Sequence, residues 1–346
     1  MKSHGRAADP RAVTPVGRIL WGGAVVAGSA IGAVFGVGVV TVAEGLLARE
    51  RLMPRRVVPA ASGTGVYGED NPGDPLDLAL MGDSLAVGYG SDDPTRTVGT
   101  ILADELAQAS GRPVRLRNVA EVGAESAHLP GQLTALVRSS PTPDVAVIIV
   151  GANDVMHLKR LVDALQPLSR TVRELRAAGS EVIVATCPDL GTVLPFFQPL
   201  RYFAHWLSRL LATSQTIVVL RAGGRTVSLA DTLGPLFRRD PSSMFSSLDR
   251  LHPSGLGYTR AAEVLLPSVR VAAGYPSHDD VRVPHRVYLK GSRHPLAWLA
   301  FRASRRVGAR LTALGESGGP AELTADQATP EAVEVTGRVE VSGRSG

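Results

Sequence analysis

Between residues 76 and 269, continuous apolar runs alternate with segments of helical periodicity, and this alternation constrains the fold more than any other feature. The runs lack the polar–apolar alternation of a half-solvated strand, so each is expected to be buried on both faces. Strands separated by helices favour a parallel sheet with helices on both sides. The expected strands are residues 76–81, 114–119, 145–150, 182–186 and 226–229, and the expected helices are residues 97–109, 158–178, 202–213 and 255–269, with Ser254 as N-cap of the last.

The charge balance argues against a nucleic-acid-binding protein. The 346 residues contain 37 Lys and Arg against 32 Asp and Glu, so the net charge of +5 is small for this length. A nucleic-acid-binding surface is expected to carry a block of basic residues interleaved with aromatic residues. This sequence has no such block, and its basic residues are spread along the chain. The single cysteine, Cys187, excludes an intrachain disulfide and is expected to be buried at a strand end. The sequence contains no zinc-ligand cluster, phosphate-binding loop or dinucleotide motif, so we expect no metal and no cofactor.

Residues 19–43 contain no charge and follow a basic tail at residues 1–18. As a helix these 25 residues would span roughly 38 Å, enough to cross a bilayer core of about 30 Å with some tilt. A cleaved signal peptide has a shorter apolar region, of about 7 to 15 residues. We therefore expect an uncleaved transmembrane helix. Its Gly28, Gly32 and Gly36 would lie on one face and allow close packing in a homodimer.

The remaining chain is divided by composition into a linker, a domain and two C-terminal segments. The linker is expected at residues 44–74 and the domain at residues 75–275. Residues 276–314 are basic, with apolar residues near helical spacing; an amphipathic helix on anionic lipid and a solvated helix packed on the domain both fit. Residues 315–346 are acidic and are expected to be disordered. Arginines flank both ends of residues 19–43, so the distribution of positive charge does not decide the orientation of the expected transmembrane helix. A short basic N-terminal tail is commonly retained inside the cell. This places the domain outside the cytoplasm or in the cell envelope.

Two short motifs nearly 170 residues apart supply the parts of a serine hydrolase. Ser84 stands in a Gly-Asp-Ser-Leu run directly after the first expected strand. Asp249 and His252 lie three residues apart, before Pro253. A serine hydroxyl is a poor nucleophile without an adjacent base, and the base needs a group that fixes its tautomer. The three residues therefore predict a nucleophile, a base and an orienting acid.

Acyl transfer also requires donors for the negatively charged oxygen of the tetrahedral intermediate. Three candidates follow strands of the expected sheet. They are the backbone N–H groups of Ser84 and Gly123 and the side-chain amide of Asn153. Because ligand sites in parallel sheets form at the carboxyl ends of the strands, these donors are expected to converge on one site.

Together these motifs resemble the SGNH hydrolases, also called GDSL esterases and lipases. The resemblance covers about residues 76 to 273. It implies an α/β fold with a flavodoxin-like three-layer α/β/α sandwich and a central parallel sheet, and metal-free hydrolysis of esters or thioesters. It assigns Ser84 as nucleophile, His252 as base and Asp249 as acid, with Ser84, Gly123 and Asn153 as the oxyanion hole. The overall layout is similar to that of membrane-associated or exported actinobacterial members. The motifs, in family order, are residues 82–85, Gly123, residues 151–154 and Asp249 with His252-Pro253.

Three functions remain open from the sequence. The first is a membrane-anchored esterase acting on short- to medium-chain acyl esters, with an ester or a lipid-like molecule as substrate. The second is an acyltransferase that moves the acyl group from Ser84 to an envelope glycan or lipid. The third is a non-catalytic, membrane-tethered binding module. The aromatic-rich residues 193–206 fit either a lid or lining of an apolar pocket, or ordinary helix packing.

Overall fold

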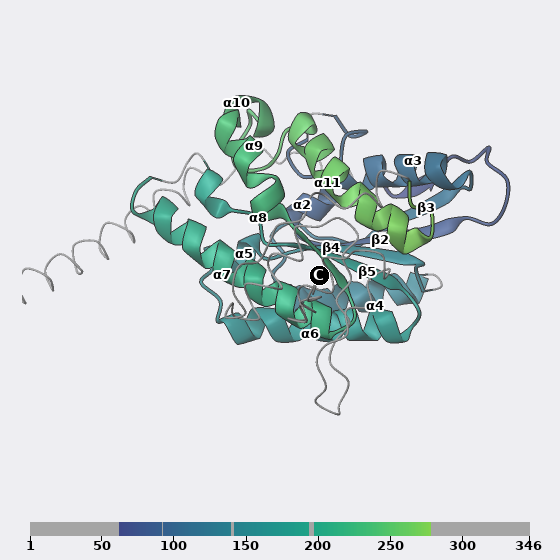
Figure 1. The fold of residues 1–346 in the computed structure, drawn as a ribbon, viewed down its shortest axis with the longest axis horizontal. Coiled ribbons are helices and arrows are strands. Elements are labelled where there is room, and N and C mark those ends of the chain that lie inside the picture. Colours follow the sequence, from purple (N-terminus) through teal and green to yellow (C-terminus); the bar gives the residue numbers. More distant parts are fainter. Residues whose placement is uncertain (1–61, 92, 140–141, 194–196, 278–346) are drawn as a thin grey trace, which may run out of the picture.

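A computed structural model of the chain describes residues 62–277, apart from residue 92, residues 140–141 and residues 194–196 (Figure 1). Its centre is a six-stranded sheet in the order β1-β3-β2-β4-β5-β6. All neighbouring strands are parallel except β1 and β3. Counted along the chain, the five parallel strands therefore lie in the order 2-1-3-4-5, the flavodoxin-like arrangement. The strands are β1 Gly65–Tyr67, β2 Leu76–Gly82, β3 Val114–Asn118, β4 Val145–Ile149, β5 Glu181–Thr186 and β6 Arg225–Ser228.

The antiparallel strand β1 corrects the expected domain boundary. It lies inside the range 44–74 that was expected to be linker, and Val66 pairs with Arg115 of β3. The strand has only three residues and two of them are exposed, so it carries no apolar run for sequence reasoning to detect. The sheet is accordingly mostly parallel, with one antiparallel edge.

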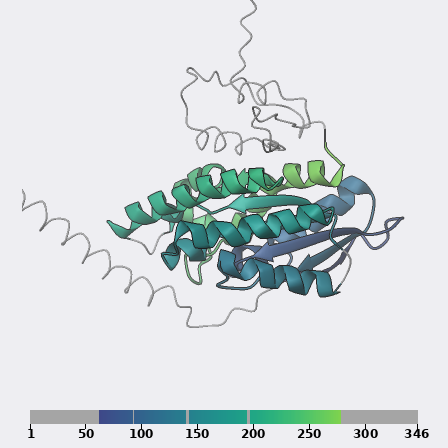
Figure 2. The ribbon, with the colours of Figure 1, turned by 90° about the horizontal axis from the view of Figure 1, so that it is seen from below.

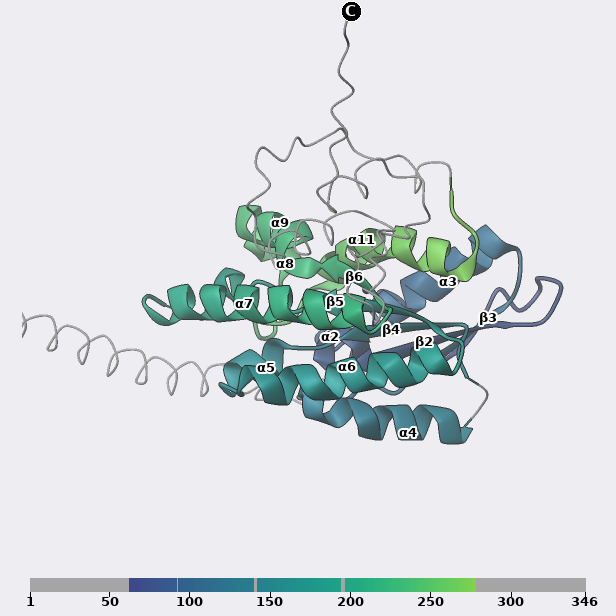
Figure 3. The same ribbon diagram turned by 60° about the horizontal axis from the view of Figure 1, so that its bottom comes forward.

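Helices cover both faces of the sheet, which gives three layers (Figures 2 and 3). α3 Val98–Ser110 and α11 Gly255–Ala273 pack together on one face. α4 Leu129–Ser139, α6 Leu161–Ala177 and α7 Leu200–Arg221 lie on the other face. The shorter helices connect strands or border the site: α2 Ser84–Val87, α5 Ala152–Met156, α8 Leu229–Thr232, α9 Gly234–Arg239 and α10 Pro241–Met244, with the 3₁₀ turns η1 Ser126–His128 and η2 Leu190–Thr192.

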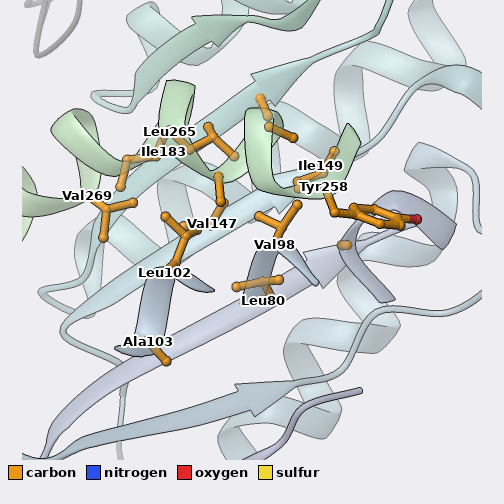
Figure 4. Close-up of a cluster of buried hydrophobic side chains, with 14 of the residues drawn as sticks. Leu80, Val98, Leu102, Ala103, Val147, Ile149, Ile183, Tyr258, Leu265 and Val269 are labelled. Atoms are coloured by element: carbon orange, nitrogen blue, oxygen red, sulfur yellow. The ribbon is translucent and has the colours of Figure 1, made fainter. Parts of the chain in front are cut away.

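Two cores fill the spaces between these layers because alternate strand residues point to opposite faces. Leu78 and Leu80 of β2 join the α3–α11 core, whereas Ala79 and Met81 join the core under α4 and α6. All four are fully buried. Figure 4 shows Leu80 in the first core among side chains from α3, α11 and neighbouring strands. Burial on both faces explains why the strand sequences read as continuous apolar runs.

The expected start of α11 agrees with the structure, but the helix ends at Ala273 and not at the expected residue 269. The hydroxyl of Ser254 accepts a hydrogen bond from the N–H of Gly257 at 3.1 Å, so this residue caps α11 as expected. The helix α4 is not among the expected helices, and Pro130 and Gly131 occupy its first turn. Both residues are tolerated there, since the first backbone N–H groups of a helix have no intrahelical partner.

No helix within the described residues is long and apolar enough to span a membrane. The expected anchor at residues 19–43, the basic segment after residue 277 and the C-terminal tail lie outside the described residues. The anchor, its orientation and its self-association therefore stay predictions.

Candidate active site

The first expected site residue, Ser84, is held at the carboxyl end of β2 by a tight turn. Gly82 adopts φ 124°, and a Cβ atom there would lie 1.8 Å from the carbonyl oxygen of Ile149, so only glycine fits. Gln132 accepts from the N–H of Gly82 at 2.7 Å and donates to its carbonyl at 2.8 Å. The Asp83 carboxylate accepts from the N–H of Leu85 and caps α2. Ser84 is thus the first residue of helix α2, directly after the carboxyl end of β2.

The structure brings Ser84, Asp249 and His252 into one hydrogen-bonded chain. His252 Nε2 lies 2.9 Å from Ser84 Oγ, and His252 Nδ1 lies 2.6 Å from Asp249 Oδ2. The other carboxylate oxygen of Asp249 accepts from the N–H groups of Leu251 and His252, at 2.9 and 3.0 Å. One carboxylate therefore shapes the turn and binds the ring that the turn carries.

The turn is fixed from outside as well. The His252 carbonyl accepts from the N–H of Ser246 at 2.8 Å. The Tyr89 ring meets the imidazole edge to face, with centroids 4.8 Å apart. Gly90 passes so close that a Cβ atom there would lie 2.9 Å from His252 Cβ, and its φ is 84°. These contacts leave the imidazole little freedom to turn away from Ser84.

The electrostatics of Asp249 favour the tautomer that a base needs. Burial raises the pKa of this carboxyl, but hydrogen bonds from the His252 ring and from the N–H groups of Leu251 and His252, together with the attraction of the imidazolium, outweigh burial and hold the pKa below its usual value. Asp249 is therefore ionised at neutral pH and accepts a proton-bearing Nδ1. His252 Nε2 is then left as the acceptor for the Ser84 hydroxyl.

The three expected oxyanion donors line the same cavity as Ser84 and His252. The Asn153 amide donates one N–H to the Ala124 carbonyl at 2.9 Å. A primary amide has two N–H donors, so the second is available to a bound oxygen. The loop carrying Gly123 is held to the sheet because the Gly82 carbonyl accepts from the N–H of Glu121 at 3.1 Å.

Two acidic residues clamp the Gly123 loop to the Asn153 helix, and neither contact was predicted from the sequence. Asp154 accepts from the N–H and hydroxyl of Ser126, at 3.1 and 2.9 Å. Glu125 accepts from His157 Nδ1 at 2.7 Å and from Lys159 Nζ at 3.0 Å. Glu125 and His157 are 32 positions apart with no shared motif, so nothing in the sequence pointed to the pair.

Asp83, next to the nucleophile, carries a second perturbed carboxyl. Burial raises the pKa of Asp83 to about 7; the N–H of Leu85 opposes the rise, and the nearby Asp154 carboxyl adds to it. One oxygen of Asp83 is buried without a hydrogen-bond partner, which also disfavours the ionised form. The carboxyl thus changes charge near neutral pH inside the folded protein.

We expect this carboxyl to make stability fall as pH rises. The folded-state pKa of about 7 lies above the unfolded value. Between about pH 4 and 7 the folded state keeps a proton that the unfolded state releases, so the free energy of unfolding decreases with pH. Asp83→Asn retains an oxygen for the Leu85 N–H and should remove that decline. Urea denaturation of both proteins at about pH 5 and pH 8 measures it; equal pH dependence in the two proteins would contradict the assignment.

The cavity beside Ser84 has a volume of about 170 Å³ and mostly apolar walls. Ser84, Asn153 and His252 stand at its polar part. From there it continues between the sheet and the helices α9 and α11. The inner wall is formed by Val98, Ile149, Leu229, Phe237, Ala261 and Leu265.

Only part of the aromatic-rich residues 193–206 can be compared with the expectation, because residues 194–196 lie outside the described residues. Val193 lines the cavity, but the described aromatic residues after it do not. Tyr202, Phe203 and Trp206 are exposed on α7. These three side chains neither line the pocket nor pack into the core, whereas Ala204 on the same helix is buried.

Among the described residues, no group of three or more His, Cys, Asp or Glu side chains is placed to hold a metal ion. Cys187 is fully buried, and burial raises its thiol pKa well above the usual value. It behaves as the small buried residue expected from the sequence.

Comparison with known proteins gives a consistent result. A model of the GDSL-like lipase/acylhydrolase family matches residues 80–260, which are 181 of the 346 residues. A GDSL-like esterase of Mycobacterium tuberculosis is 44% identical over 200 residues. The match covers 57% of this chain and 63% of that relative's length.

Solved structures give weaker likenesses. TesA is 21% identical, with a TM-score of 0.46, over 57% of this chain and 99% of TesA. A catalytic mutant of an acetylxylan esterase from Geobacillus stearothermophilus is 17% identical, with a TM-score of 0.42, over 62% of this chain and 100% of that one.

Proposed function

The chain belongs to the GDSL-like lipase/acylhydrolase family, and on that premise we propose that it is a serine esterase acting on carboxylic esters or thioesters. The observation that carries the proposal is the hydrogen-bonded chain from Ser84 through His252 to Asp249 beside the donors of the cavity. A serine hydroxyl within 2.9 Å of an imidazole that a carboxylate orients has the geometry of an activated nucleophile.

The proposed reaction has two halves. In the first, His252 Nε2 takes the proton of Ser84 Oγ as the oxygen attacks the ester carbonyl. The negatively charged oxygen accepts from Ser84 N–H, Gly123 N–H and the Asn153 amide. His252 then gives the proton to the departing alcohol and leaves an acyl group on Ser84. In the second half, His252 takes a proton from water, which attacks the acyl-enzyme and regenerates the hydroxyl.

The direct test is hydrolysis of p-nitrophenyl acetate by the full-length chain. Labelling with a fluorophosphonate, followed by peptide mapping, should locate the adduct on Ser84 because only an activated serine reacts with this probe. A folded chain that neither hydrolyses the ester nor takes up the probe would favour the binding-module alternative.

Removing the side-chain donor of the oxyanion hole should slow turnover without removing the nucleophile. We expect Asn153→Ala to reduce kcat by roughly 10²–10³, because one preorganised donor to the developing charge is lost. KM should change little, since the donor acts mainly in the transition state. Steady-state kinetics with p-nitrophenyl acetate measure both constants. A loss seen only in KM would place Asn153 in substrate binding instead.

The apolar cavity supports short- to medium-chain acyl groups as substrates. Its inner wall between β4 and α11 is made of aliphatic and aromatic side chains, so it gains free energy by enclosing methylene groups and offers no partner for a sugar or a charge. The acyl chain would extend from Ser84 toward Ala261 and Leu265.

The inner end of the cavity should therefore determine acyl length. Ala261→Leu fills that end, and we expect kcat/KM for octanoate esters to fall roughly 10–100-fold relative to acetate, as the contact of a few methylenes is lost. Ala262 is the matched control, because it is fully buried on the same helix but does not line the cavity. Ala262→Leu should share any loss of stability but not the change in chain-length preference. An unchanged preference in Ala261→Leu would exclude this part of the cavity as the acyl site.

Transfer to a glycan or lipid hydroxyl would proceed through the same acyl group on Ser84. The two reactions differ only in the acceptor of the second half. Product analysis with water and alcohol acceptors together separates them.

A further inference from the structure

The first half of helix α7 is apolar on the side that faces away from the protein. Its inner side packs through Ala204, Leu211 and Ala212. Its outer side repeats exposed apolar residues four positions apart, as in Tyr202, Trp206 and Leu210, which therefore form one stripe. Trp206 is 58% exposed and Tyr202 is 55% exposed. A contiguous group of exposed apolar side chains such as this is typical of a surface that contacts a partner or a membrane.

A second exposed apolar segment lies at the connection of α5 and α6, which both pack beside α7 (Figures 1 and 3). Leu158 is 75% exposed and has a positive φ of 51°. Lys159 and Arg160 follow it and are also exposed. We call the two segments together the apolar rim, which comprises Tyr202, Phe203, Trp206, Leu207 and Leu210 of α7 and Leu158, Leu161 and Val162.

The apolar rim borders the mouth of the substrate cavity. Met156, at the end of α5, is exposed and lines the cavity. Leu190 and Val193 also line the cavity, and the 3₁₀ turn η2, which contains Leu190, packs against α7. A flat apolar surface that covers the rim would therefore lie directly beside the opening.

The first described residues of the chain lie at the carboxyl ends of the strands, on the same side of the sheet as the substrate cavity. The Asn118 side chain, at the carboxyl end of β3, donates to the carbonyls of Ser62 and Ala86, at 3.0 and 2.8 Å. Ser62 therefore lies at the same edge as α2 and Ser84. Residues 44–61 between it and the predicted anchor span at most roughly 60 Å when fully extended. Residues 44–61 would thus keep the carboxyl ends of the strands close to any bilayer that holds residues 19–43.

We propose that the apolar rim docks on the surface of an anionic lipid bilayer. Tyr and Trp favour the headgroup level of a membrane, where the ring is partly buried and its polar atom stays hydrated. Arg160 adds positive charge beside exposed leucines, the combination that binds anionic lipid. The neighbouring Lys159 is paired with Glu125 at 3.0 Å. The docked orientation brings the cavity mouth to the lipid surface. It does not depend on the chemistry of Ser84, so docking and hydrolysis are tested separately.

Tryptophan fluorescence can test the contact in the full-length chain. The sequence has three tryptophans, and Trp21→Phe with Trp298→Phe leaves Trp206 alone. In vesicles of equal parts phosphatidylcholine and phosphatidylglycerol, a nitroxide-labelled lipid should quench most of the Trp206 emission. The matched control moves the single tryptophan by Val137→Trp and Trp206→Phe. Val137 is apolar and half exposed, like Trp206. It stands near the end of α4, on the side of the sheet where the strands begin, so a tryptophan at this position should stay unquenched.

A charge reversal tests the electrostatic part. Arg160→Glu in the Trp206-only chain should lower lipid quenching, whereas Arg173→Glu, on the far half of α6, should leave it unchanged. Quenching of Trp206 no stronger than that of the Val137→Trp control would overturn the proposal. Protection of Trp206 from both the lipid nitroxide and aqueous acrylamide would also overturn it, because another segment or a second copy would then cover the rim. Hydrolysis of soluble p-nitrophenyl acetate should be the same in all these variants.

Discussion

Replacing Ser84 by alanine is expected to lower ester hydrolysis by roughly 10⁶-fold in kcat, because no other group can form the acyl intermediate. A residual acceleration over water of roughly 10³–10⁴ would remain, since the oxyanion donors still polarise the bound ester. Fluorophosphonate labelling should disappear together with turnover. The measurement is p-nitrophenyl ester hydrolysis at high enzyme concentration, so that the residual rate is resolved.

The variant should fold normally. Ser84 Oγ bonds to His252 at 2.9 Å, and loss of one such bond costs about 1 kcal/mol. Ser180 provides a matched control, because its buried hydroxyl donates to the Pro143 carbonyl at 2.6 Å, at the opposite edge of the sheet. Ser180→Ala should lose similar stability and keep full activity. A Ser84→Ala protein that still turns over at the wild-type rate would end the assignment of the nucleophile.

The sequence predicted the elements whose signals are local. The buried strands were recognised because their residues are apolar on both faces, and α11 because Ser254 caps it. Strand β1 was missed because Gly65 and Val66 are exposed and its pairing with β3 is long-range. The order of the strands followed from the family resemblance rather than from any residue pattern.

The same distinction applies to the site. Ser84, Asp249 and His252 were predicted because each stands in a short motif, and the fold brings them within hydrogen-bonding distance. The groups that hold the site in place were not predictable, since each pairs residues from distant segments without a motif. Asp189, for example, accepts from His205 on α7 at 2.8 Å and from Arg238 on α9 at 2.6 Å, and so fixes the η2 wall of the cavity. His205 stands in no motif, so nothing in the sequence pointed to this contact.

Asp249→Asn is expected to reduce kcat by roughly 10⁴-fold at neutral pH while leaving the turn intact. The amide oxygen can still accept from the N–H groups of Leu251 and His252, as the carboxylate does at 2.9 and 3.0 Å. The amide nitrogen then replaces the oxygen that faces His252 Nδ1, and it can only donate. Nδ1 must become an acceptor, the proton moves to Nε2, and Nε2 can no longer take the proton of Ser84. Activity is lost through the tautomer rather than through geometry.

Two measurements separate this mechanism from simple damage to the loop. Nitrogen NMR of the imidazole should report the proton on Nδ1 in the wild type and on Nε2 in the variant. Because interactions with His252 hold the pKa of Asp249 below its usual value, the wild type gains stability above the unfolded pKa and loses it as pH falls through the folded pKa. The stability difference between wild type and variant should therefore shrink in acid. Asp240→Asn is the control, since Asp240 also accepts from a nearby N–H, that of Ser243, but has no histidine partner and should keep full activity. An unchanged tautomer in an inactive Asp249→Asn protein would show that the carboxylate acts on loop geometry and not on the base.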